Sequence, residues 1–353
     1  MKLYHIIILL FIILFSCKNT ENENKSKVET EEKIEFNELD FVINDSYKIG
    51  DVRRYGVMPD EPIVKNIKTN RNAIESVIDL AEKSGIKMTF PKGFYNDGLY
   101  IKGRSNIELN FEDAEFSGPI NIIENENKVW SKDIKLTGTV ITYYKLFVRY
   151  AKDIEIENLS IKSDSQKNIA NLRSMGCDIY AGTQYLFIKN LHIEDLGSEQ
   201  DTNQSFKLTR AAIQVHGFNE NPSNVIIQKI LINSSDRHGI YLTGNNHQID
   251  EIVINKFGVG SLENIQGLDD TDLLAKETNQ ITGVWLNKCN NSAIGSITIN
   301  TKNSKGTYSV WLDEGNIGEP TTIEKVTLIG GDKQLPIFAN ELSNCVIRKV
   351  IKL

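Results

Sequence analysis

The sequence predicts an all-β protein, a right-handed parallel β-helix (solenoid) with an N-terminal capping helix. Three observations predict it: a short aliphatic pattern that repeats after residue 150, an alternating pattern ahead of most copies, and one amphipathic helix near the N-terminus. Short units that repeat at about 20 to 50 residues are typical of solenoids. The chain of 353 residues, 40% hydrophobic and 25% charged, is long enough for one large domain.

The repeating pattern places aliphatic residues at offsets 0, 3 and 5. Its copies begin at Ile156, Ile188, Ile227, Ile249, Ile294 and Ile323, with a truncated last copy at Ile347. The starts are 22 to 45 residues apart, so the shortest spacing is one coil and the longer ones contain loop insertions. We therefore expect stacked coils from about Lys132 to the C-terminus, with these isoleucines in one internal ladder.

The alternating pattern predicts a second short strand in most coils. It covers residues 179–181, 213–215, 240–242, 284–286, 310–312 and 337–339. The middle residue of each triplet should face outward. The predicted outward column is Tyr180, Gln214, Tyr241, Trp285, Trp311 and Phe338. Aromatic rings about 4.8 Å apart would offer flat apolar faces to several sugar rings; alternatively, they stack beneath a loop.

The N-terminal part of the domain is expected to cap the open end of the coils. Thr69 or Asn70 can N-cap a helix that ends at Gly85. Its apolar stripe is Ile74, Val77, Ile78 and Ala81. A strand at 88–90 and a turn at 91–93 should follow.

Three motifs around this helix carry a family resemblance: DVRRYG at 51–56, TFPKGFY at 89–95 and IELN at 107–110. They resemble the opening of the pectate lyase-like superfamily, which includes polygalacturonases, β-helix polysaccharide lyases, mannuronan epimerases and phage tailspike depolymerases. The motifs cover about residues 48–120, the expected cap and first coils. The resemblance implies a right-handed parallel β-helix and a polysaccharide substrate.

The N-terminus predicts a lipoprotein signal peptide at 1–16. Lys2 precedes an apolar run at 6–15, and Ser16-Cys17 closes it, so we expect cleavage before Cys17 and lipidation of its thiol. Residues 17–39 should be a disordered tether, and residues 40–353 a single β-helix domain. The protein is then expected in the cell envelope, anchored to a membrane by lipid and either periplasmic or surface-exposed.

Composition and cysteine spacing narrow the possible partners. The net charge of −7 disfavours nucleic-acid binding, which usually requires a basic excess. Cys177, Cys289 and Cys345 lie far apart and predict neither a disulfide framework nor a zinc site. No cofactor is expected, although the loop with Asp269, Asp270 and Asp272 has enough oxygens for Ca²⁺.

The candidate catalytic residues are Arg210, Arg237 and His238. Arg210 and Arg237 lie three positions before the inward residue of successive coils, so an anionic sugar could bridge them, and nearby positive charge would keep His238 neutral as a base. An aspartate such as Asp236 could instead pair with an arginine. By the resemblance, the segment 236–244 corresponds to a strand that carries paired aspartates in polygalacturonases; Arg237 and His238 replace them.

Other candidates for substrate binding are His216 and Asp313, which either line a groove beside the aromatic column or are simply solvated, and Asp178, which could reach the same face. The absence of the paired aspartates favours a lyase acting on an acidic (uronate-containing or sulfated) polysaccharide over a hydrolase, which needs two carboxylates. The alternatives are a polygalacturonase-like glycoside hydrolase using Asp178, Asp236 or Asp313, and a non-catalytic glycan-binding surface lipoprotein.

Overall fold

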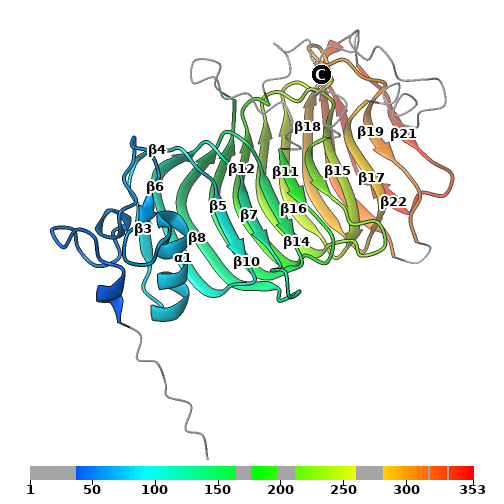
Figure 1. The fold of residues 1–353 in the computed structure, drawn as a ribbon. Coiled ribbons are helices and arrows are strands. Elements are labelled where there is room, and N and C mark those ends of the chain that lie inside the picture. Colours follow the sequence, from blue (N-terminus) through cyan, green and yellow to red (C-terminus); the bar gives the residue numbers. More distant parts are fainter. Residues whose placement is uncertain (1–36, 164–175, 197–210, 260–280, 317–318, 332–333) are drawn as a thin grey trace, which may run out of the picture. The chain divides into compact units, whose positions relative to one another are not determined.

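The computed structural model describes residues 37–163, 176–196, 211–259, 281–316, 319–331 and 334–353 (Figure 1). Within these ranges, 21 strands form one continuous sheet in which every pairing is parallel and each strand also pairs with a strand one coil away. This confirms the all-β parallel β-helix. The predicted signal peptide and all of the tether up to residue 36 lie outside the described residues. No helix in the described ranges is long and apolar enough to cross a membrane.

The N-terminal cap contains the only α-helix of the described chain, α1 (Ala73–Ser84). It is preceded by two 3₁₀ turns, η1 (Glu38–Asp40) and η2 (Val52–Tyr55), and by the antiparallel pair β1 (Lys65–Asn66) and β2 (Arg71–Asn72). Helix α1 contacts β5 and β6 of the first coils, at the N-terminal end of the stack (Figure 1). The predicted cap helix is therefore present where the open core needs cover.

The helix begins later than the sequence pattern predicts. Its N-cap is Asn72, whose side chain accepts from the backbone N–H of Ile74 at 2.8 Å, rather than Thr69 or Asn70. The reason is the β1–β2 pairing, which keeps residues 71–72 extended. The predicted end is confirmed, since Gly85 takes the left-handed conformation that a helix C-cap requires.

Long strands make up most of each coil. They are β6 (Ser105–Phe116), β8 (Ser131–Thr142), β10 (Ala151–Ile161), β12 (Gln184–Ile193), β14 (Ser223–Ile232), β16 (Gln248–Ile254), β18 (Ala293–Asn300) and β20 (Thr321–Ile329). The short strands β3 (Met88–Phe90) and β4 (Gly93–Tyr95) open this series against β6, and β22 (Cys345–Ile347) and β23 (Val350–Lys352) close it against β20. The stack thus begins at Met88, within the region 48–120 where the N-terminal motifs predict the cap and first coils, although the repeating pattern alone predicts coils only from about Lys132.

The register of the long strands confirms the predicted internal ladder. The first residues of the repeating pattern pair in one unbroken series: Ile156, Ile188, Ile227, Ile249, Ile294, Ile323 and Ile347. All but the last are at most 1% exposed. Each isoleucine therefore packs on its counterparts in the coils above and below, and this column is the centre of the core.

A second series of strands, most of them shorter, completes the coils. They are β5 (Leu99–Lys102), β7 (Ile120–Ile123), β9 (Leu146–Arg149), β11 (Cys177–Ile179), β13 (Ala211–Val215), β15 (His238–Asn245), β17 (Thr282–Asn290), β19 (Tyr308–Leu312) and β21 (Ile337–Ala339). We call this series the short-strand sheet. Its inward residues are buried in the core, and its outward surface is the short-strand face.

One predicted strand has the wrong register. The sequence pattern places residues 179–181 opposite 213–215, but Cys177, Asp178 and Ile179 pair with Ile213, Gln214 and Val215. Cys177 is completely buried in the inward ladder, and Asp178 takes the outward position that had been assigned to Tyr180. This correction moves a carboxylate into the middle of the short-strand face.

Candidate functional site

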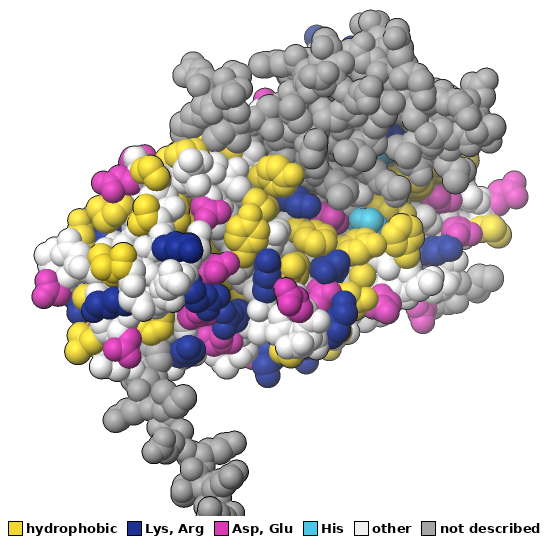
Figure 2. Space-filling model, viewed as in Figure 1, with side chains coloured by type: hydrophobic (Ala, Val, Ile, Leu, Met, Phe, Trp, Pro, Cys, Tyr) yellow, Lys and Arg dark blue, Asp and Glu magenta, His cyan; other side chains and the backbone are white. Residues whose placement is uncertain are grey.

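The short-strand face carries one outward residue per coil in a straight column. In order from the N-terminal end the column is Tyr100, Asn121, Phe147, Asp178, Gln214, Tyr241, Trp285, Trp311 and Phe338. Its C-terminal half is aromatic, as predicted, whereas its centre is polar. Figure 2 shows hydrophobic side chains gathered on this side of the coils with charged side chains of both signs beside them.

The two tryptophans of the column stack on each other. Their ring centroids are 4.6 Å apart and their planes differ by 3°. Nε1 of Trp285 also donates to Oδ2 of Asp313 at 3.2 Å, and Oδ1 of Asp313 accepts from Nδ2 of Asn340 at 3.2 Å. Because the facing sides of Trp285 and Trp311 contact each other, they are not the open flat faces that the sequence led us to expect. Asp313 serves to hold this stack.

The polar centre of the column contains a histidine–carboxylate pair. Oδ1 of Asp178 lies 3.4 Å from Nε2 of His216, and their side chains are 2% and 11% exposed. His216 directly follows β13, and its backbone N–H donates to the carbonyl oxygen of Ile179, which fixes it one coil above Asp178. Both residues were predicted to reach this face, and the structure brings them together.

Gln214 lies between Asp178 and Tyr241 in the same column. Its side chain is completely buried, and within the part of the chain that the structure describes neither Oε1 nor Nε2 has a hydrogen-bond partner. An unpaired buried amide costs about 1–3 kcal/mol. The sheet therefore keeps an unsatisfied polar group directly beside the Asp178–His216 pair.

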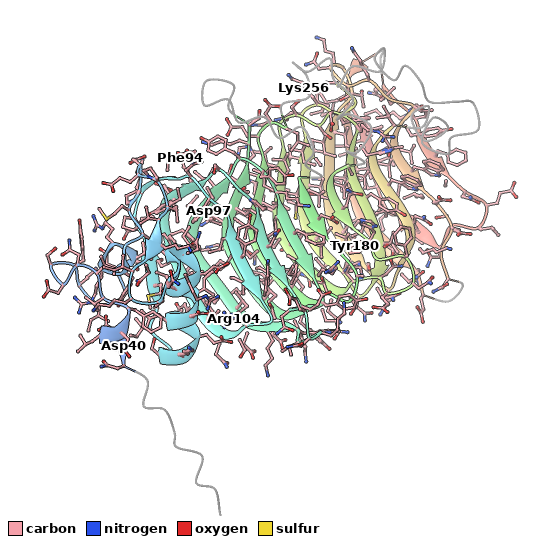
Figure 3. The ribbon with its side chains drawn as sticks, in the orientation of Figure 1. Asp40, Phe94, Asp97, Arg104, Tyr180 and Lys256 are labelled. Atoms are coloured by element: carbon pink, nitrogen blue, oxygen red, sulfur yellow. The ribbon has the colours of Figure 1, made fainter. Side chains whose placement is uncertain are left out.

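Three aromatic rings surround His216. The centroids of Tyr180, Phe218 and Tyr241 are 4.8, 6.0 and 6.1 Å from that of the imidazole. Tyr180 occupies the next outward position beyond Asp178, and Figure 3 places it within the stack of coils. Phe218 is 72% exposed and has a positive φ of 55°, which is unfavourable for a bulky residue. An exposed phenylalanine is thus held at the rim of the site.

Positive charge lies on the preceding coil. The Nζ of Lys145 is 4.7 Å from the centroid of Phe147, and the guanidinium of Arg149 is 5.7 Å from it on the same strand. Burial lowers the pKa of Lys145 from its ordinary value, and the nearby charge of Asp178 partly opposes this. Lys145, Asp178 and His216 therefore occupy three successive coils of one face.

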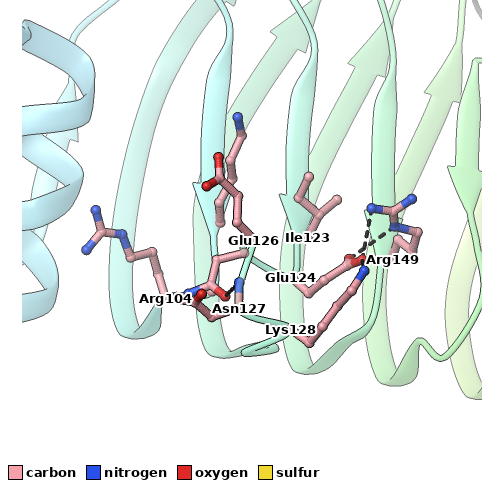
Figure 4. A pocket seen from close by; sticks show the side chains of 10 residues that line it. Arg104, Ile123, Glu124, Glu126, Asn127, Lys128 and Arg149 are labelled. Atoms are coloured by element: carbon pink, nitrogen blue, oxygen red, sulfur yellow. Dashed lines mark hydrogen bonds and ion pairs between the residues drawn. The ribbon is translucent and has the colours of Figure 1, made fainter.

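Arg149 also lines a pocket of about 580 Å³ at the N-terminal end of this face (Figure 4). Glu124 is held there by Nε and Nη2 of Arg149 at 3.0 and 2.9 Å, and by Nζ of Lys128 at 3.7 Å. The strand register continues from Arg149 to Tyr180 in the next coil. Arg149 therefore links the pocket to the coil that precedes His216, and the carboxylate of the pocket, Glu124, is engaged in ion pairs.

The predicted centre around His238 lies at the other end of the short strands. Nδ1 of His238 accepts from the backbone N–H of Thr282 at 3.0 Å and lies 3.1 Å from its Oγ1. The neutral imidazole then carries its proton on Nε2. His238 contacts the ring of Trp285, with 5.5 Å between centroids. This geometry favours His238 as a hydrogen-bond donor over His238 as a base.

The structure describes one of the two arginines predicted beside His238. Arg237 is 1% exposed and Asp236 2%, and Oδ1 of Asp236 accepts from the backbone N–H of Arg237 at 3.0 Å. Arg210 lies outside the described residues, so the bridging of two guanidiniums by one anion stays a prediction.

The cysteines and the possible metal ligands show no reactive thiol and no metal site within the described residues. Burial raises the pKa of Cys177 far above its ordinary value and that of Cys289 to about 12, so neither is a reactive thiol. In the described ranges no three His, Cys, Asp or Glu side chains are grouped so that they could hold a metal ion. The predicted Ca²⁺ loop at 269–272 lies outside them.

Sequence reasoning missed Lys145, Phe147 and Phe218. The triplet 146–148 alternates in the same way as 213–215 and would have revealed Phe147, with Lys145 next to it. No sequence signal identifies Phe218, whose position depends on the turn after His216.

Comparisons with known proteins give no further identification: no family model, no curated protein and no solved structure matches this chain significantly.

Proposed function

We propose that this protein is a lipid-anchored polysaccharide lyase that binds an acidic, uronate-containing glycan on the short-strand face. The observation that carries the proposal is the placement of Lys145, Asp178 and His216 on three successive coils of this face. They follow a diagonal: Lys145 precedes and His216 follows, each by two positions, the residues that pair with Asp178. We also assign the chain to the pectate lyase-like superfamily, on the strength of its N-terminal motifs and its parallel coils.

Elimination from a uronate has two requirements. A cation must reduce the charge on the sugar carboxylate, and a base must take the proton from the adjacent carbon. Lys145 can meet the first requirement, because a partly desolvated ammonium gains more from an anionic partner than a hydrated one does. Histidine is the residue most often used for the second. The rings of Tyr180 and Phe218 supply apolar surface for the sugar.

A glycoside hydrolase is less consistent with this face. Two catalytic carboxylates lie about 5 to 9.5 Å apart. Asp178 and Asp313 are separated by four strand spacings, from β11 to β19, or about 19 Å. Asp313 is moreover engaged by Trp285 and Asn340. Within the described chain these two aspartates cannot act on one glycosidic bond.

The test is incubation of the protein with polygalacturonate, alginate and hyaluronan, with amylose as the neutral control. A lyase produces unsaturated uronates, which absorb in the ultraviolet, from one of the acidic chains and nothing from amylose. New reducing ends without this absorbance would indicate a hydrolase. Binding without cleavage of any chain would indicate a non-catalytic glycan-binding protein; both outcomes overturn the proposal.

Two lysine variants test the role of the cation. Lys145→Met should raise KM for the acidic chain, because the carboxylate loses its charged partner. Lys189→Met is the matched control, since Lys189 lies on β12, away from this face, and pairs with Glu157 at 3.2 Å. An unchanged KM in Lys145→Met would remove Lys145 from the substrate site.

A further inference from the structure

We infer that His216 is the catalytic base of this protein and that Asp178 is its positioning residue, an assignment that rests on the lyase function proposed above. It moves the base from His238, near the start of the short strands, to the far end of the same face. Three structural features carry the assignment: the state of the two histidines, the burial of Asp178, and the rings around the imidazole.

His238 and His216 differ in which ring nitrogen contacts a neighbouring polar group. In His238 the occupied nitrogen is Nδ1, which accepts from the backbone N–H of Thr282 and so leaves the proton on Nε2. In His216 it is Nε2 that faces a carboxylate, Oδ1 of Asp178. A carboxylate favours the tautomer with the proton on the nitrogen it faces. We therefore assign the role of the base to Nδ1 of His216, the nitrogen that does not face the carboxylate.

The two residues of the pair differ in burial. The Asp178 side chain is almost completely buried, whereas that of His216 keeps 11% of its surface exposed. At 3.4 Å, Oδ1 of Asp178 and Nε2 of His216 face each other without forming a hydrogen bond, so both atoms lack a hydrogen-bond partner in the described part of the chain, as do both amide atoms of Gln214. Buried polar atoms without partners are costly and are rarely kept for stability alone. Here they lie next to His216, on its own strand and on the neighbouring coil.

The rings around His216 define where a sugar would lie. Tyr180 and Tyr241 flank the imidazole, and Phe218 projects 72% of its surface into solvent at the rim. Lys145 lies on the coil before Asp178, and we assign it to the uronate carboxylate. The face thus offers a base with an apolar wall beside it and, two coils before the base, a cation.

The proposed step is a β-elimination that needs no second reactant. Nδ1 of His216 takes the proton from C5 of the uronate, and the electron pair left on C5 forms the C4=C5 double bond. The C4–O4 bond breaks, and the leaving O4 receives the proton from the imidazolium. Asp178 stabilises the imidazolium while it carries that proton.

The experiment compares four variants of the full chain on the acidic glycan that the wild type cleaves. His216→Ala should lower kcat by about 100-fold or more, the usual contribution of a general base. Added imidazole should restore part of that rate, because it can enter the space of the missing ring. His192→Ala is the control histidine; it lies on β12 and contacts Asn233 at 3.0 Å, away from this face, so its kcat should equal that of the wild type.

The Asp178→Asn variant tests whether Asp178 positions the His216 imidazole or only stabilises the fold. It should lower kcat about 10- to 100-fold with little change in KM, because the amide no longer orients or stabilises the imidazole. In the double variant with His216→Ala, the aspartate change should cost nothing further, since residues that act as a unit are not additive. A structural role predicts the same cost with and without His216.

The outcomes separate this inference from the proposed function. If the wild type releases no unsaturated product from any acidic chain, the lyase function fails and the assignment of His216 fails with it. If the wild type cleaves one and His216→Ala retains full kcat, only the assignment is overturned. Loss of kcat in His216→Ala without imidazole rescue, and with an additive double variant, also overturns it, in favour of a structural histidine.

Discussion

Trp285 and Trp311 stack almost parallel on successive coils, with 4.6 Å between their centroids. This distance is close to the spacing of neighbouring strands, so the stack follows directly from two tryptophans at paired positions of a parallel sheet. Stacked aromatic pairs contribute about 0.5–1.5 kcal/mol beyond the burial of their area. The aromatic half of the column thus stabilises the short-strand sheet, while the polar centre holds the proposed site.

The first prediction follows from this division. Trp285→Ala should lower the free energy of unfolding by about 2 to 4 kcal/mol, because it removes the stack on Trp311 and the hydrogen bond to Asp313. Chemical denaturation followed by circular dichroism measures it. Phe338→Ala, at a position 40% exposed near the end of the same column, should cost clearly less. If Trp285→Ala leaves stability unchanged but weakens glycan binding, the tryptophans belong to the substrate site.

The fold could be predicted from the sequence because the repeated residues occupy buried positions of the coils. Ile156, Ile188 and the later isoleucines occupy a ladder in which any polar residue would be buried, so the pattern cannot drift. The register of β11 failed for a local reason. Cys177–Ala181 alternates over five residues, so two triplets fit equally well, and only the pairing with β9 and β13 chooses between them.

The candidate site was less accessible to sequence reasoning. Asp178 and His216 are 38 positions apart and were identified only as residues on the same face. Their contact depends on the corrected register of β11. The tautomer of His238 depends on a backbone N–H from the neighbouring coil, that of Thr282, which no sequence pattern marks. Side-chain orientation, as in the Trp285–Trp311 stack, is likewise a product of packing.

The second prediction concerns the internal ladder. Ile227→Ala should lower the free energy of unfolding by about 2 to 5 kcal/mol, because the cavity opens between Ile188 and Ile249 in a closely packed column. The matched control is Ile226→Ala on the outward side of the same strand, expected to cost about 1 kcal/mol or less. Equal costs for the two variants would contradict the inward placement of Ile227.

The third prediction concerns the membrane anchor. Cys17→Ser should transfer the protein from the membrane fraction to the soluble fraction and abolish incorporation of labelled fatty acid, because the signal sequence presents this thiol for lipidation. Cys345→Ser is the control, since Cys345 is a half-buried residue of the last coil and should not affect fractionation. Membrane association that survives Cys17→Ser would exclude the lipid as the anchor.

The last prediction is a pH dependence of stability that arises from His247. Its Nε2 donates to the carbonyl oxygen of Thr243 at 2.9 Å, and its Nδ1 accepts from the backbone N–H of Val225 at 3.2 Å. Burial lowers the pKa of His247 from 6.5 to about 4, with the Thr243 bond opposing the shift. The neutral ring, with both nitrogens used, is therefore the form that the folded protein requires.

The unfolding free energy should decrease as the pH falls, because the unfolded chain is protonated before the folded one. As pH falls below about 6.5 the unfolded chain takes up the proton first, so stability is fully present above this pH and is lost progressively down to pH about 4. At about 1.4 kcal/mol per pH unit, the loss is about 3 kcal/mol. Unfolding free energies measured across this range should show the decline in the wild type. The His192→Asn variant should keep most of this decline, because the pKa of His192 is also lowered by burial and its removal takes away only its own share. The His247→Asn variant should show little decline, from a lower stability at neutral pH. A decline of equal size in His247→Asn would assign it to other groups.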